Sequence, residues 1–205
     1  MNHQEYRRIV PGADMAVLMI HGIVGTPHHF DNLIPLIPAN WSVVNLLLEG
    51  HGQGTAEFGA ASMDQWKGQV SRELDALLAY HEKVLIVGHS MGTLFAIQSA
   101  IDHPGKIPAL FLLAVPTRPH VRLSTWVTCL RVAFGKRNRP ADRALAGETA
   151  LELTPKLWKY IGWLPRMIEL LSECNRVRKI LPILTTPTLA FQSRVDELVS
   201  IRACK

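Results

Sequence analysis

A serine between two glycines is the side chain of this sequence best placed for nucleophilic chemistry. Ser90 lies in the segment Gly-His-Ser-Met-Gly at 88–92, which follows the apolar run 84–87 and opens a helical pattern. Strand, Gly-x-Ser-x-Gly and helix in this order predict a nucleophile elbow, a sharp turn that raises a serine hydroxyl above a sheet. Such a turn leaves no room for side chains at Gly88 and Gly92, and it strains the serine backbone. The alternative is an ordinary turn that contains glycine and serine.

Three further segments come directly after apolar runs. Active-site loops have this position after the strands of a parallel sheet. Residues 15–20 lead into His-Gly-Ile-Val-Gly-Thr-Pro at 21–27, residues 46–52 read Leu-Leu-Leu-Glu-Gly-His-Gly, and the run 188–192 precedes Val-Asp-Glu-Leu-Val at 195–199. Together with the elbow, these segments resemble the α/β-hydrolase superfamily of serine hydrolases, in particular small carboxylesterases and monoacylglycerol lipases. The resemblance covers nearly the whole chain. It implies an α/β-hydrolase fold, with a mostly parallel sheet, helices on both faces and a helical cap.

The resemblance also implies the machinery of ester hydrolysis. Such a reaction needs a nucleophile, a base, an acid that orients the base, and donors for the developing oxyanion. By resemblance, Ser90 is the nucleophile, the backbone N–H groups of Ile23 and Met91 form the oxyanion hole, and Asp196 is the acid, with Glu197 as its neighbouring competitor. The chemistry requires no cofactor and no metal. The expected partner is a small-molecule acyl ester.

The general base is missing from its expected place. In this superfamily the order along the chain is serine, acid, histidine, but none of residues 197–205 is histidine. The sequence can stop short of the native C-terminus, without the last strand and helix; the protein can be a catalytically silent binding module; or another histidine, first of all His120, can serve as base. We favour the first explanation. Taken literally, the 205-residue chain is then expected to be nearly inactive.

The other histidines have simpler interpretations. His21 is expected to hold the oxyanion loop, and His89 to point to another side of the sheet than Ser90. His28 and His29 open a helix without the spacing of metal ligands. The remaining histidines are His51, in the loop after the second main strand, and His3, His81 and His103, at expected surface positions.

Strands and helices alternate along the chain, which predicts a parallel sheet with right-handed crossovers. Strands are expected near 15–20, 43–48, 84–87, 108–114 and 187–192, with a short one near 6–10. Ser62 and Gln65 form a capping box at the start of a helix. Its apolar face consists of Trp66, Val70, Leu74, Leu77 and Leu78.

Residues 116–182 interrupt this alternation with a helical pattern, and we expect them to form a cap inserted into a core of residues 1–115 and 183–205. The apolar positions of the expected cap are Trp126, Val127, Leu130, Phe134, Leu157, Trp158, Ile161, Trp163, Leu164, Ile168, Leu170 and Leu171. Some of Trp126, Trp158 and Trp163 are expected to face an apolar pocket over Ser90. The segment carries 13 Lys/Arg against 5 Asp/Glu. This charge could attract anionic or interfacial acyl substrates, but solvated helix faces are the favoured interpretation.

Composition narrows the class of protein further. The chain has 205 residues and a formal net charge of +5, which is typical of one globular domain. Residues 1–8 lack the apolar core of a signal peptide, and no apolar stretch is long enough to span a membrane. Three widely spaced cysteines favour the reducing cytoplasm. No nucleic-acid-binding motif is present, and the oligomeric state stays open.

Overall fold

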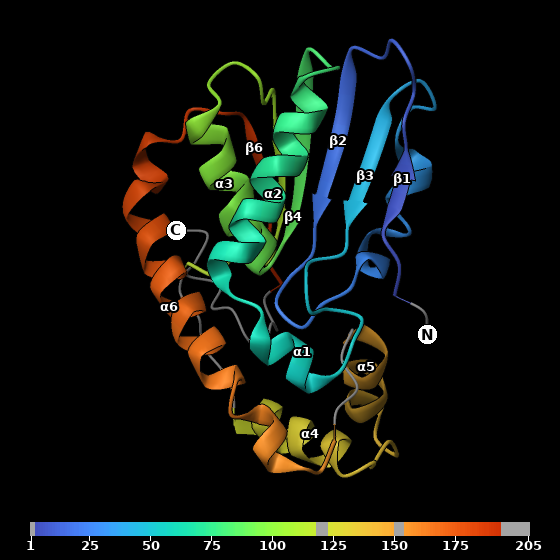
Figure 1. Ribbon diagram of the computed structural model, residues 1–205, viewed down its shortest axis with the longest axis vertical. Coiled ribbons are helices and arrows are strands. Elements are labelled where there is room, and N and C mark those ends of the chain that lie inside the picture. Colours follow the sequence, from blue (N-terminus) through green and yellow to red (C-terminus); the bar gives the residue numbers. More distant parts are fainter. Residues whose placement is uncertain (1–2, 118–122, 150–153, 194–205) are drawn as a thin grey trace.

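The fold is built on a sheet whose strands are mostly parallel. The computed structural model describes residues 3–117, 123–149 and 154–193, and within them the sheet has six strands in the order β1-β3-β2-β4-β5-β6 (Figure 1). Only β1 runs antiparallel to its neighbour. The strands are β1 (Tyr6–Arg8), β2 (Met15–Ile20), β3 (Ser42–Leu46), β4 (Lys83–His89), β5 (Leu110–Leu113) and β6 (Thr188–Phe191). The expected α/β sheet is therefore confirmed.

The parallel strands bring their following loops to one edge of the sheet. β2 pairs with β4, and β4 with β5, so the segments after Ile20, His89 and Leu113 start side by side. In Figure 1 the arrowheads of β2 and β3 point toward the short helix α1 (Thr55–Ala60) and toward α4 (Leu123–Ala133) and α5 (Pro140–Glu148) below it. This edge is where ligands bind in open α/β sheets.

The long helices lie on one face of the sheet. α2 (Met63–Leu78) and α3 (Met91–Asp102) cross this face, and α6 (Trp163–Ile180) lies beside α3 (Figure 1). In the described part of the chain, the opposite face is lined by two 3-10 turns, η1 (Pro27–Phe30) and η2 (Ile34–Leu36), around a smaller core that contains Phe30. None of the described helices has the length and apolarity needed to cross a membrane.

Helix α2 begins where the sequence predicts. The Ser62 hydroxyl accepts a hydrogen bond from the Gln65 N–H, which satisfies one orphan amide of the first turn. The predicted apolar face is confirmed, since Trp66, Val70, Leu74 and Leu77 are buried and Leu78 packs against them. The Met63 N–H is satisfied by Glu169 of α6, at 3.0 Å, a contact across more than 100 residues that no local pattern could indicate.

The segment 116–182 is helical, as expected, but its apolar residues are not arranged as the pattern predicts. α4 (Leu123–Ala133) packs on α5 (Pro140–Glu148) around the fully buried carboxylate of Asp142, which accepts hydrogen bonds from Arg131 and Arg139. This polar centre turns the α4 face of Thr128, Arg131 and Val132 inward. The opposite face is exposed, with Val127, Leu130 and Phe134 between 45% and 58% accessible. These three apolar side chains of α4 therefore do not form a buried core in the described structure.

Two tryptophans of this segment do not lie where the expected acyl pocket would place them. Trp158, in η3 (Leu157–Tyr160), is 66% exposed. Trp163 packs edge-on against Phe58 of α1, and its indole N–H donates to the Thr55 carbonyl. These contacts join α6 to α1. The side chain of Trp126 lies outside the described part of the structure.

Helix α6 takes part in two regions of the molecule. Its first turn contacts α1, while Cys174 and Val177 in its later turns belong to the main core cluster beneath α3. Burial raises the pKa of the Cys174 thiol to about 11. The second half of α6 is thus part of the helical layer over the sheet.

Candidate active site

Ser90 occupies a sharp turn between β4 and α3. Its backbone has φ 51° and ψ −118°, a region that residues other than glycine rarely adopt. The Ser90 N–H donates to the Leu113 carbonyl at 2.8 Å, and the Ser90 carbonyl accepts from the N–H and the hydroxyl of Thr93 at 2.9 and 2.6 Å. These bonds hold the elbow in the strained conformation that the sequence predicts.

The two glycines of the elbow have the steric role expected of them. A Cβ added at Gly88 would lie 2.8 Å from the Cα of Thr93, and one added at Gly92 would overlap the carbonyl oxygen of Ile20. Strand β4, helix α3 and the end of β2 therefore approach each other backbone to backbone. Any side chain at these positions would push the elbow away from β2.

The loop after β2 passes directly against Ser90. Residues 22–25 form a turn in which the Gly25 N–H donates to the Gly22 carbonyl at 3.0 Å. A Cβ at Gly22 would lie 2.8 Å from the Cβ of Ser90. Within the described ranges, neither the Ile23 nor the Met91 N–H donates to any acceptor. Two amide donors without protein acceptors thus lie on the segments that meet at the serine.

Backbone strain is concentrated at this edge of the sheet. Among the described residues other than glycine, positive φ angles occur at Val24, Ser90 and Ala114, with values of 50°, 51° and 56°. These residues follow the carboxyl ends of the neighbouring strands β2, β4 and β5. Each residue in such a conformation costs of the order of 1–3 kcal/mol of stability, and such residues cluster at functional sites. Val24 and Ala114 could not be predicted from the sequence, because neither residue type favours positive φ.

His21 holds the loop after β2, as predicted. Its ring is fully buried, the Nδ1–H donates to the Gly22 carbonyl at 2.8 Å, and Nε2 accepts from the Leu48 N–H at 3.1 Å. Burial, with a smaller contribution from the neighbouring His51, lowers the pKa of His21 well below its ordinary value. A neutral imidazole therefore joins the end of β2 to the end of β3.

His51 has a packing role in the same loop cluster. Its ring contacts the rings of His21, Phe58 and Trp66 at 4.7 to 5.3 Å between centroids. Burial lowers its pKa to about 4. The side chain is 1% exposed, and its Nε2 has no hydrogen-bond partner among the residues described.

One histidine was misplaced by sequence reasoning. His81 was expected at the surface, but it is buried, with Nδ1–H donating to the Leu77 carbonyl and Nε2 accepting from the Ser42 hydroxyl. It ties the end of α2 to the start of β3. A short loop after an amphipathic helix has no periodicity that would reveal such a contact.

No base for Ser90 is found in the described part of the chain. No described histidine makes a hydrogen bond to the Ser90 hydroxyl, and the ring of His89 packs edge-on against that of His29 at 5.0 Å. His120, Asp196 and Glu197 lie outside the described residues. The same holds for the expected end of the sheet beyond β6. No group of His, Cys, Asp or Glu in the described ranges could hold a metal ion.

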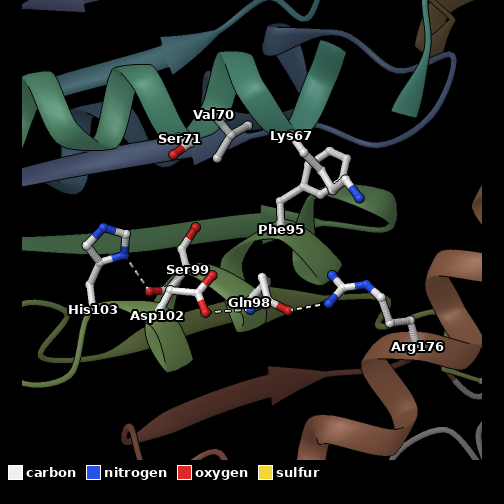
Figure 2. Close-up of a pocket in the computed structure, with 9 residues that line it drawn as sticks. All are labelled: Lys67, Val70, Ser71, Phe95, Gln98, Ser99, Asp102, His103 and Arg176. Carbon is white, nitrogen blue, oxygen red and sulfur yellow. Dashed lines mark hydrogen bonds between the residues drawn. The ribbon is translucent and has the colours of Figure 1, made fainter. Parts of the chain in front are cut away.

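A groove of about 370 Å³ lies between α2, α3 and α6, apart from the serine (Figure 2). Seven of its nine lining residues are polar or charged, and Gln98 links Asp102 to Arg176 through hydrogen bonds of 2.6 and 2.5 Å. None of the predicted site residues lines this groove. It is therefore not the candidate site.

Comparison with known proteins gives a family for most of the chain. The family model described as "Alpha/beta hydrolase family" matches residues 17–199. A pimeloyl-(acyl-carrier protein) methyl ester esterase of Neisseria meningitidis is 35% identical over 117 residues, which are 56% of this chain and 42% of the relative. A fluoroacetate dehalogenase of Burkholderia sp is 29% identical over 114 residues, 53% of this chain and 37% of the relative. The chain thus spans less than half the length of these curated relatives.

Solved structures share the fold over almost the whole chain. A structure of the metagenome-derived lipolytic enzymes LipS and LipT superposes with a TM-score of 0.72 at 20% identity, covering 98% of this chain and 80% of that one. The monoacylglycerol lipase of Paleococcus ferrophilus gives 0.61 at 18% identity, covering 91% and 76%. At such identities the likeness concerns the fold, while the relatives' names range from esterase to dehalogenase.

Proposed function

The chain belongs to the alpha/beta hydrolase family, and on that basis we propose that it is a serine hydrolase that cleaves carboxylic esters through an acyl-enzyme on Ser90. In the proposed reaction the Ser90 oxygen attacks the ester carbonyl carbon and its proton passes to a general base. The carbonyl oxygen becomes an oxyanion, the alcohol leaves with the proton, and water then hydrolyses the acyl-enzyme.

The observation that carries this proposal is the position of two unused amides beside a strained serine. The Ile23 and Met91 N–H groups have no acceptor in the described part of the chain, and they flank the point where Gly22 touches Ser90. We assign both amides to the oxyanion hole. Each such donor contributes about 3 kcal/mol to stabilising the transition state.

The remaining parts of the machinery belong to the same proposal. Asp196 is the proposed acid, since it comes five residues after the end of β6 in the sequence, and the carboxyl end of β6 lies at the edge of the sheet where the loops of β2, β4 and β5 start. Residues 116–182 are the proposed cap. A cytoplasmic location is part of the proposal, since the three cysteines of the sequence are widely spaced and form no Cys-x-x-Cys pair.

The substrate class follows from the relatives only in outline. The esterase and lipase names among them favour acyl esters over other electrophiles. A panel of methyl and p-nitrophenyl esters with increasing acyl length, a monoacylglycerol, a thioester and an amide would order these preferences. Methyl esters of acyl chains on a carrier protein belong in the panel because one relative bears that name.

A binding module without activity is the second candidate. It is favoured by one observation, that none of the described histidines makes a hydrogen bond to the Ser90 hydroxyl. Such a module would hold an acyl ligand or a partner at the edge of the sheet beside Ser90, without turnover.

A serine-reactive fluorophosphonate probe distinguishes the proposed serine hydrolase from the binding module. Ser90-dependent labelling is expected, and it is expected to be slow in the 205-residue chain, because loss of the triad histidine costs about a millionfold in turnover. Ser90→Ala should abolish the labelling, while Ser71→Ala, which removes an exposed hydroxyl of α2, should leave it unchanged. A form of the protein whose chain continues past Lys205 and supplies a histidine should react rapidly.

The other outcomes are equally informative. Rapid labelling of the 205-residue chain would point to an internal base, with His120 the first residue to substitute. Binding of acyl ligands, with no labelling of Ser90 in any form of the protein, would favour the binding module.

A further inference from the structure

The turn that carries the proposed oxyanion donor Ile23 is held by a residue from a distant part of the chain. Thr149 ends helix α5, where its N–H donates to the Leu145 carbonyl. Its side-chain hydroxyl donates to the carbonyl of Val24 at 3.1 Å, across 125 residues of sequence. Thr149 is 9% exposed, so this hydroxyl is largely shielded from water.

With this contact, both polar groups of one peptide unit are hydrogen-bonded. The unit between Val24 and Gly25 donates through the Gly25 N–H to the Gly22 carbonyl, and it accepts through the Val24 carbonyl from Thr149. Val24 is β-branched and has φ 50°, a conformation that such a residue adopts only when its surroundings impose it. With both ends of the peptide unit bonded, the turn cannot relax by rotating it.

The direction of the Ile23 N–H depends on that turn, because Ile23 lies between Gly22 and Val24. An oxyanion donor acts only when it is aimed at the developing charge before the reaction starts. We therefore infer that Thr149 is a positioning residue, which reaches from the end of α5 to hold the oxyanion turn in its strained, donor-presenting conformation. This inference rests on the proposed function, since it gives the Ile23 amide a catalytic use.

Hydrogen exchange of single amides tests the positioning directly. Thr149→Val removes the hydroxyl but keeps the shape of the side chain, and Thr149→Ser keeps the hydroxyl. In Thr149→Val, the Gly25 N–H is expected to exchange about tenfold faster, since the bond that restrains its peptide unit is gone. The amides of Arg143 and Thr149 within α5 should keep their exchange rates, which shows that the helix is intact. Thr149→Ser should behave like the unaltered chain.

Labelling of Ser90 by the fluorophosphonate tests the catalytic part. The rate is expected to fall about tenfold in Thr149→Val and to recover in Thr149→Ser, because the phosphonyl oxygen occupies the oxyanion hole. Val24→Gly removes the strain, so Thr149→Val should slow labelling less in the Val24→Gly background than in the unaltered one. A purely structural role of Thr149 would give equal effects in both backgrounds.

The failures of the two proposals are distinguishable. If no labelling depends on Ser90, the proposed function fails, whatever Thr149 does. If labelling depends on Ser90 but Thr149→Val alters neither the labelling rate nor the exchange of Gly25, the positioning role is overturned. Unfolding of Thr149→Val would be seen in the α5 amides, and Thr149→Ala then replaces it under the same criteria.

Discussion

Buried imidazoles give the loops around Ser90 a dependence on pH. His21 and His51 pack against each other at 4.7 Å, and burial lowers the pKa of both. A histidine whose pKa is lower in the folded than in the unfolded protein stabilises the fold fully above the unfolded value of about 6.5. As the pH falls below that value, the unfolded chain takes up a proton that the folded chain does not, and stability is lost until the folded pKa is reached.

For His51 this loss is large enough to measure. Its pKa of about 4 places the window between pH 6.5 and 4, and the contribution of this one ring over that window is about 3 kcal/mol. His51→Phe keeps an aromatic ring beside Phe58 and Trp66 and should remove this pH-dependent contribution to stability. Urea unfolding at several pH values should therefore show that the unfolding free energy of the unaltered chain falls, relative to that of the variant, by about that amount as the pH decreases through this window. Parallel curves would contradict the assignment.

Single residues were predictable where the physical demand is local. The glycines at 88 and 92 and the strained Ser90 follow from one five-residue segment, because their roles arise from sterics within the turn and its two neighbouring elements. Val24 and Thr149 could not be found in this way. The Val24 carbonyl accepts a hydrogen bond from Thr149, 125 positions away, and no local pattern indicates such a contact.

Among the elements, α6 carries two side chains that form hydrogen bonds to the ends of two other helices. Arg166 donates to the Gly59 carbonyl in the last turn of α1, and Glu169 accepts from the Met63 N–H in the first turn of α2. The two side chains also pair with each other at 2.6 Å. A cation at a helix C-terminus and an anion at a helix N-terminus both oppose the helix macrodipole favourably.

Glu169→Ala should weaken the junction of α6, α1 and α2. It leaves the first amide of α2 without its acceptor and Arg166 without its carboxylate partner, so we expect a loss of stability of about 1–2 kcal/mol. Glu169→Gln keeps an acceptor oxygen and should lose less. Glu82→Ala removes an exposed carboxylate, 69% accessible, and serves as the control. Equal unfolding free energies for Glu169→Ala and Glu82→Ala would show that the contact contributes nothing.

The strands were easier to predict than the helices of 116–182. All six strands lie within a few residues of the expected positions. For the central strands β2, β3 and β4 the reason is that apolar runs covered on both faces leave a clear signal. In α4 the apolar pattern indicated the wrong face, since the buried charge of Asp142 determines how α4 and α5 pack. A buried ion pair between two helices has no periodicity of its own.

Over the whole molecule, the two edges of the sheet differ in their protection. β1 is three residues long and carries Arg7, which pairs with Glu73. β6 pairs with β5 alone among the described strands, and its Leu189 and Phe191 are 55% and 52% exposed. Short strands and charges protect an edge from pairing with another chain, whereas an apolar edge invites it.

The apolar edge should make the 205-residue chain associate with itself as its concentration rises. Leu189→Lys places a charge on the open strand and is expected to weaken this association severalfold. Leu36→Lys changes a leucine that is 77% exposed but lies in η2, away from the edge, and it should have little effect. Sedimentation velocity over a range of concentrations would measure both, and equal behaviour of the two variants would exclude β6 as the contact.

The sharing of α6 between two regions determines how the molecule can open. Lifting all of 116–182 away as a rigid lid would expose Cys174 and Val177, which are at most 1% accessible, and each buried side chain of the size of valine costs roughly 2 kcal/mol to expose. The α4–α5 pair packs around its own ionic centre, although Val132 and Ala133 at the end of α4 are buried as well. In the proposed mechanism, Thr149 holds the oxyanion turn only while α5 stays in place, because its hydrogen bond to the Val24 carbonyl breaks when α5 moves away. A substrate that displaced α5 on entry would therefore be activated only after α5 had returned.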